Sequence, residues 1–166
     1  MIKKQDLLRK TDMAVFVPFS VVEELEDISK YRDELGNAAK EVIVFSAIES
    51  VELKNEYKSL ADRIARFPRV DKGEAEALAL SYQLNAKELV IDDIDAIGSL
   101  AGISKVIGVE IVPSSYILIR AYLNGILDYE ETKSLLKELA VKRGWEQSVL
   151  YETAIIMLEE AKKIKS

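Results

Sequence analysis

Short apolar runs alternate along the chain with longer amphipathic stretches. A run that is apolar without interruption predicts a buried parallel strand, because such a strand is covered on both faces. Two runs fit, Ala14–Val17 and Leu89–Ile91, and we expect a third strand over Val109–Val112, in which Glu110 is the polar residue. Between residues 41 and 53 two readings stay open. One is a strand over Val42–Phe45, and the other is a short helix followed by a strand near Ile48–Leu53.

The amphipathic stretches predict helices between these strands. One helix is expected to end near Arg9, and a second to run from Ser20 to a stop at Gly36-Asn37. Further helices are expected over residues 55–66, 73–83, 96–102, 115–123, 128–143 and 148–163. Strands that alternate with helices at this spacing predict an α/β fold with a mostly parallel, four-stranded sheet. We expect a single domain over residues 1–166, with helices 128–163 packed on it. The apolar positions of these last helices, such as Leu136 and Ile156, could serve either the core or a homodimer.

Composition restricts the chemistry that is available. The chain has 166 residues, 29 acids and 23 bases, with no histidine and no cysteine. A thiolate metal site, a disulfide and a histidine base are therefore excluded, so any metal ligands are carboxylates, which suit Mg²⁺ or Mn²⁺. The longest run without a charge, Met13–Val22, is too short to span a membrane. We expect a cytoplasmic protein, and the frequent Lys, Glu and Ile fit a thermophile.

Acidic residues lie near the ends of the predicted strands, where sites form in open α/β sheets. They are Glu23 and Glu24, Glu74 beside Asp71, and Asp92 with Asp93. If such carboxylates converge, they repel one another, and a divalent cation that relieves the repulsion can activate water against a phosphate ester.

Helix capping is the competing interpretation of the same acids. Ser20–Glu23, Asp71–Glu74 and Asp128–Glu131 all have the form of a capping box, and Asp93 can be an N-cap. Spacing alone favours capping for Glu23 and Glu74. Asp92, directly after an apolar strand, has no role in a core.

Six bases in nineteen residues could contact a nucleic-acid backbone, although the pattern favours a solvated helix face. They are Lys54, Lys58, Arg63, Arg66, Arg69 and Lys72.

Two segments resemble the PIN-domain family. Pro18–Leu25 reads P-x-x-V-x-x-E-L, and Gly73–Ala77 with Ile91–Asp93 gives the GEAEA…IDD signature of a prokaryotic subfamily of predicted nucleic-acid-binding proteins. The segment Gly144–Tyr151 is also similar to that subfamily.

The resemblance implies a three-layer α/β/α sandwich and RNA cleavage that depends on Mg²⁺ or Mn²⁺. Glu24, Glu74 and Asp92 would be the catalytic metal ligands, supported by Asp93 and Asp95. Many relatives are toxins, so the implied partners are RNA and an antitoxin-like protein.

The chain departs from the family pattern in three places. The family begins with a strand that ends in a metal-binding aspartate, whereas here Asp6–Arg9 already matches the helix after that strand. We therefore expect either that the true start lies upstream or that the chain is naturally shortened, since Asp6 and Asp12 are poor substitutes. The arginine that usually follows IDD is absent from Ile94–Ser99, and Pro113–Ser115 replaces a glycine–threonine turn.

Three functions stay open at this point. The chain is a metal-dependent ribonuclease, or a degenerate PIN-like scaffold that binds protein or RNA or dimerises. In the third reading it is an acidic structural module whose acids only cap helices.

Overall fold

The computed structural model describes residues 4–11, 13–45 and 47–165, with side chains from Leu7 onward. It contains two compact units. One is formed by residues 14–112, and the other by residues 113–166 together with residues 1–13. Helices and parallel strands confirm the predicted α/β class. The expectation of one domain over the whole chain stays a prediction.

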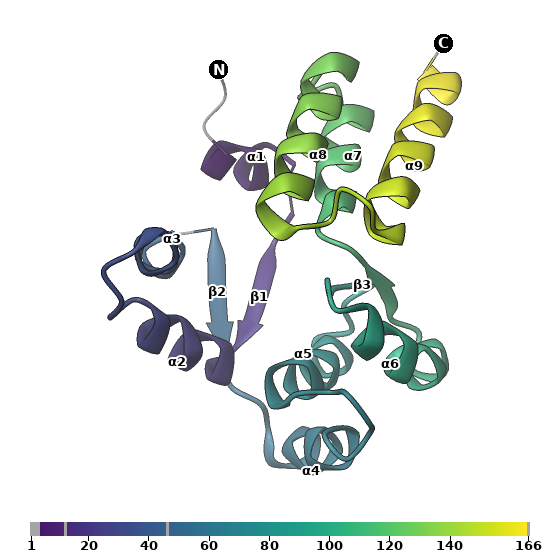
Figure 1. The fold of residues 1–166 in the computed structure, drawn as a ribbon. Coiled ribbons are helices and arrows are strands. Elements are labelled where there is room, and N and C mark those ends of the chain that lie inside the picture. Colours follow the sequence, from purple (N-terminus) through teal and green to yellow (C-terminus); the bar gives the residue numbers. More distant parts are fainter. Residues whose placement is uncertain (1–3, 12, 46, 166) are drawn as a thin grey trace. The chain divides into compact units, whose positions relative to one another are not determined.

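The unit of residues 14–112 carries all the described strands (Figure 1). Its elements are β1 (Val15–Pro18), α2 (Phe19–Ile28), α3 (Glu34–Ile43), β2 (Ile48–Val51), α4 (Asn55–Ile64), α5 (Lys72–Gln83), β3 (Glu88–Val90), α6 (Ile94–Ile107) and β4 (Glu110–Val112).

The four strands form two parallel pairs. In β1 and β2, Val15 lies opposite Ile48, and in β3 and β4, Leu89 lies opposite Ile111. One continuous four-stranded sheet, as the sequence predicted, is not formed among the described residues. Packing joins the two pairs instead, because α5 contacts both β1 and β3.

Three predicted helix boundaries are wrong. The helix expected over residues 96–102 continues to Ile107 as α6. The helix expected to run to Gly36-Asn37 ends at Ile28, and α3 starts at Glu34 because the Asp33 carboxylate accepts a hydrogen bond from the Gly36 N–H at 2.8 Å. The expected capping box of Ser20 is also absent, because α2 begins at Phe19 and no side chain caps it. Of the two readings for residues 41–53, the helix followed by a strand is confirmed.

The core of this unit is built around α5. Leu78 of α5 packs with Ile64 of α4, Leu100 of α6 and Leu89 of β3, and these four side chains are buried. Ala75 of α5 is fully buried too, and its small side chain lets the neighbouring elements approach closely.

The other unit consists of helices alone in its described part. They are α1 (Lys4–Lys10), α7 (Ser115–Leu123), α8 (Tyr129–Arg143) and α9 (Val149–Lys165). Ile119, Leu136 and Leu158 join α7, α8 and α9 in one core, which confirms the core alternative for Leu136, whereas Ile156 is exposed. The predicted capping box is confirmed at the start of α8, where Asp128 and Glu131 bond reciprocally.

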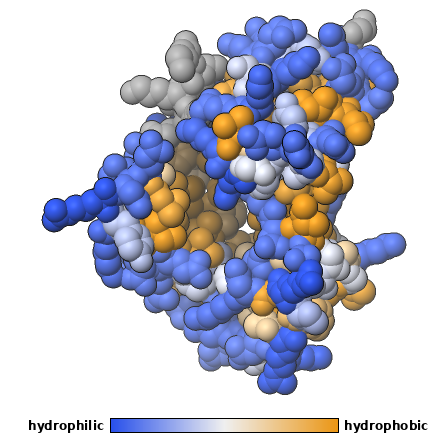
Figure 2. Space-filling model, viewed as in Figure 1, coloured by the Kyte–Doolittle hydropathy of each residue, from blue (hydrophilic) through white to orange (hydrophobic). Residues whose placement is uncertain are grey.

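The surface is mostly hydrophilic on the face in Figure 2, with apolar patches between the polar residues. None of the helices in the described residues is long and apolar enough to cross a membrane.

Gly36 gives a direct test of the break between α2 and α3. A Cβ atom at Gly36 would lie 2.1 Å from the Tyr31 carbonyl oxygen, which belongs to the backbone and cannot move away cheaply. We expect Gly36→Ala to lower the free energy of unfolding by about 1–3 kcal/mol, the range for overpacking. Thermal and urea unfolding followed by circular dichroism measure this change.

Gly98 is the matched control in the same unit. It lies within α6, and a Cβ atom there would meet nothing within 4 Å. Gly98→Ala should therefore stabilise the protein by about 0.5–1 kcal/mol, as expected for alanine in a helix interior. Equal effects of the two substitutions would contradict the proposed contact at Gly36.

Candidate functional site

The start of α5 is fixed by a capping box, as the sequence predicted. The Asp71 carboxylate accepts a hydrogen bond from the Glu74 N–H at 2.7 Å. The Glu74 carboxylate accepts one from the Asp71 N–H at 3.0 Å. The two carboxylates are thereby held side by side at the N-terminus of a largely buried helix.

Glu24 reaches the same place from α2. A Cβ atom built on Gly73 would lie 3.8 Å from Glu24 Oε1 and 3.4 Å from Asp71 Oδ1. Both carboxylates therefore lie within 4 Å of one point above the buried Gly73. A Cβ atom there would make only ordinary contacts, so Gly73 marks the place where α2 and the start of α5 approach each other.

Glu74 is the acid of this group whose pKa is shifted. Burial raises the pKa of Glu74 above its usual value, and the charges of Asp71 and Asp93 raise it further. The hydrogen bond from the Asp71 backbone opposes these effects. Negative charge is therefore concentrated at the start of α5, and the carboxylate of Glu74 is less stable there than in water.

The acids after β3 differ in their partners. The Asp93 carboxylate is the N-cap of α6 and accepts hydrogen bonds from the N–H groups of Asp95 and Ala96, at 2.8 and 2.9 Å. Asp95 forms an ion pair with Arg69 at 2.5 Å. Asp92, directly before the N-cap, is half-buried.

The donor set suits a hard divalent cation, because all its members are carboxylates. The capping hydrogen bonds use one carboxylate oxygen each of Asp71, Glu74 and Asp93, so capping does not engage the second oxygen of these acids. Within the described part of the chain, however, no three acidic groups are close enough together to hold a metal ion. The residues fit the cation by type, and binding would need the side chains to close.

The predicted site residues are thus brought together in part. Glu24 meets Asp71, the capping partner of Glu74, at Gly73, and Asp93 acts on Glu74 through its charge. Asp71 belongs to this group as well, although its sequence position indicated only an N-cap. The side chain of Asp6 and the whole of Asp12 lie outside the described residues.

Half of the predicted basic surface is engaged with acids. Lys58 pairs with Glu52, Arg69 with Asp95, and Lys72 with Glu76. These pairs lower the positive charge that would meet a phosphate backbone, and the six bases remain a prediction as a nucleic-acid surface.

Parallel strands, covering helices and carboxylates gathered at a helix start define an α/β protein with a candidate acidic site. A family model described as a PIN domain matches residues 1–160, and the chain belongs to this family. The resemblance seen in the sequence is thereby confirmed. PIN domains are commonly nucleases and typically use divalent metals. No curated protein and no solved structure matches the chain significantly.

The raised pKa of Glu74 predicts a pH-dependent stability. The folded protein binds the Glu74 proton more tightly than the unfolded chain does. Protonation of Glu74 therefore stabilises the folded protein relative to the unfolded chain. This stabilisation is complete below the usual pKa of 4.5 and is lost as the pH rises through the raised pKa. Glu74→Gln should match the wild type in stability near pH 4 and exceed it at pH 7. Urea unfolding across this pH range measures the difference.

Glu131→Gln is the control for capping, because Glu131 makes the same reciprocal bonds at the start of α8. It should give no gain in stability at pH 7. If Glu131→Gln gains as much as Glu74→Gln does, the gain does not come from the acidic neighbours of Glu74.

Proposed function

We propose that the protein is a divalent-metal-dependent ribonuclease whose active site uses Glu24, Glu74 and Asp92 as catalytic metal ligands, with Asp93 in support. The proposal rests chiefly on one observation, the meeting of the Glu24 and Asp71 carboxylates at Gly73 beside Glu74. Membership of the PIN family supports the same chemistry.

The carboxylates supply what such a reaction needs from the protein. Bound Mg²⁺ or Mn²⁺ would polarise the phosphate ester and lower the pKa of an attacking water. The side chains of Glu24, Glu74 and Asp92 would hold and orient it, and the fixed starts of α5 and α6 would limit their movement. Burial, together with the charges of Asp71 and Asp93, raises the pKa of Glu74, and a bound cation would offset this cost of ionisation.

The proposed substrate is RNA, as for the relatives that the sequence resembles. In this proposal the protein acts in the cytoplasm as the toxin of a toxin–antitoxin pair, and an antitoxin-like protein is its partner. The basic residues of α4 and the segment after it, Lys58 and Arg63 to Arg69, would contact the RNA backbone.

Cleavage of end-labelled RNA in the presence of Mn²⁺ tests the proposal. Glu24→Gln, Glu74→Gln and Asp92→Asn should each lower the cleavage rate by at least about a hundredfold, because even outer residues around a metal typically matter 10–100-fold. Glu131→Gln should keep the wild-type rate, since it removes the same capping carboxylate outside the site. The matched pair separates loss of chemistry from loss of a cap.

A scaffold that binds without cleaving is the alternative, favoured by the absence of three converging acids among the described residues. Calorimetric titration with Mn²⁺ distinguishes the two functions. Binding that is abolished by Glu74→Gln and Asp92→Asn supports the metal site. No binding and no cleavage in the wild type would overturn the ribonuclease proposal and leave the scaffold.

A further inference from the structure

An aromatic pair lies where the start of α4 meets the end of α5. The rings of Tyr57 and Tyr82 contact each other edge to face, with their centroids 5.8 Å apart and their planes inclined at 72°. Tyr57 is half-buried and packs on the core, whereas Tyr82 is 47% exposed. Because an edge-to-face contact covers at most one face of a ring, the exposed Tyr82 ring keeps surface on which a flat ligand can stack.

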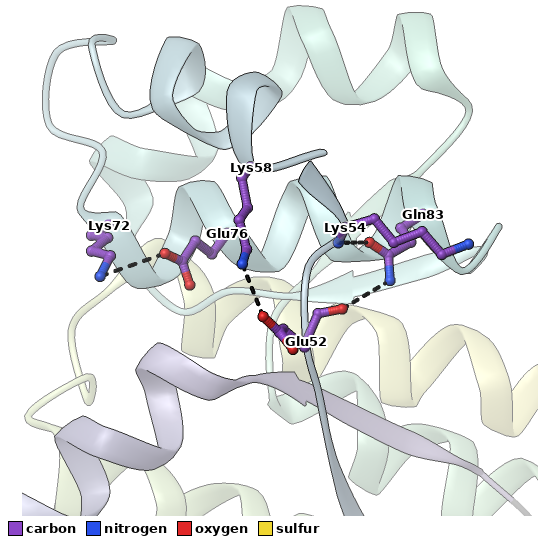
Figure 3. A network of polar contacts seen from close by, with 6 residues as sticks. All are labelled: Glu52, Lys54, Lys58, Lys72, Glu76 and Gln83. Carbon is purple, nitrogen blue, oxygen red and sulfur yellow. Dashed lines mark hydrogen bonds and ion pairs between the residues drawn. The ribbon is translucent and has the colours of Figure 1, made fainter. Parts of the chain in front are cut away.

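Lys54 stands beside this pair. It is the N-cap of α4 and precedes Tyr57 by three residues, a spacing that places two side chains next to each other on a helix. Its ammonium forms no ion pair or hydrogen bond within the described part of the chain, whereas Lys58 is paired with Glu52 at 2.9 Å (Figure 3). Glu56 follows Lys54 by two residues and therefore faces another side of α4.

Gln83, the neighbour of Tyr82, fixes the positions of these groups. Its side-chain amide accepts a hydrogen bond from the Lys54 N–H at 2.8 Å and donates one to the Glu52 carbonyl at 3.1 Å (Figure 3). The start of α4 is thereby tied to the end of α5. A binding surface whose parts are already held in place loses less conformational entropy when a ligand binds.

Helix α4 leads from this pair toward the candidate acidic site. Leu53 shares a core cluster with Leu80, and Ile64 shares one with Ala75, so α4 runs antiparallel to α5. The acidic site lies at the start of α5 and Tyr82 near its end. Since α5 has 12 residues, its two ends lie about 18 Å apart. The predicted basic positions of α4 lie between these ends.

We propose that Tyr57, Tyr82 and Lys54 form a subsite for a nucleotide of single-stranded RNA away from the cleaved bond, an inference that rests on the proposed ribonuclease function. We call this group the tyrosine platform. The base stacks on Tyr82, the Tyr57 ring supports Tyr82 from the side, and the Lys54 ammonium binds a neighbouring phosphate. Every base has a face that can stack on an aromatic ring, but the bases of a duplex are already stacked. The platform therefore selects single strands without selecting a sequence.

Binding of a fluorescein-labelled oligoadenylate of about twelve nucleotides tests the stacking contact. Fluorescence anisotropy is measured in EDTA, so that metal-dependent cleavage does not interfere. Tyr82→Leu should weaken binding at least about fivefold, because leucine keeps the apolar bulk but offers no flat ring. Tyr82→Trp should retain the affinity of the wild type. The control Tyr31→Leu removes a tyrosine that is 62% exposed between α2 and α3, and it should leave binding within about twofold.

Lys54→Gln tests the phosphate contact. The loss of one contact to a single strand should lower the slope of log K against log salt concentration by about 0.7. Lys105→Gln removes an exposed lysine of α6 in the same unit and should leave this slope unchanged. Heparin, a polyanion without bases, separates the two contacts. Its binding should be weakened by Lys54→Gln and unaffected by Tyr82→Leu.

The outcomes decide the proposal whether or not the protein cleaves RNA. Equal affinities of the wild type and Tyr82→Leu for oligoadenylate would overturn the platform, and so would an equal loss in Tyr31→Leu. A loss of duplex binding in Tyr82→Leu as large as the loss of single-strand binding would also overturn it, as would a wild type that binds no RNA. If the wild type does not cleave RNA with Mn²⁺ but the variants lose binding as expected, the ribonuclease proposal fails and the platform stands.

Discussion

The unit of residues 14–112 depends on how α5 begins. This helix is covered by β1, β3, α2, α4 and α6, and Ala75 and Leu78 are fully buried in it. The first N–H groups of a helix have no partner within the helix. The reciprocal bonds of Asp71 and Glu74 satisfy the Asp71 and Glu74 N–H groups at this helix start. Acidic side chains at this end of the helix therefore have a structural role before they have any chemical role.

Capping and metal binding do not exclude one another at such a helix start. Asp71–Glu74 and Asp128–Glu131 make nearly identical bonds, so the motif itself carries no information about function. The two boxes differ in their neighbours. Glu24 and Asp93 stand near the first box, and the pKa of Glu74 is raised. The surroundings of Glu74 make its ionisation unfavourable, and a bound cation would make it favourable.

Local features of the fold could be predicted from the sequence, and features that depend on distant contacts could not. Short runs rich in Val, Ile and Leu predicted β1, β3 and β4, and the two capping boxes were readable because their bonds span three residues. Gly36 resembled a helix stop, since glycine commonly ends helices. Its actual role is to let the Tyr31 carbonyl approach α3, which sequence spacing does not reveal. The pairing of strands in twos, and the approach of Glu24 to Gly73, are set by tertiary packing in the same way.

Ser20 shows how an error in a predicted helix start changes the role of a side chain. Had Ser20 been the N-cap, its hydroxyl would have accepted a hydrogen bond from the backbone at the start of α2. Because α2 begins at Phe19, the hydroxyl lies within the first turn and does not cap the helix. It is buried there without a hydrogen-bond partner among the described residues. A buried hydroxyl without a partner costs about 1–3 kcal/mol, so a fold under no other demand would gain stability from alanine at this position.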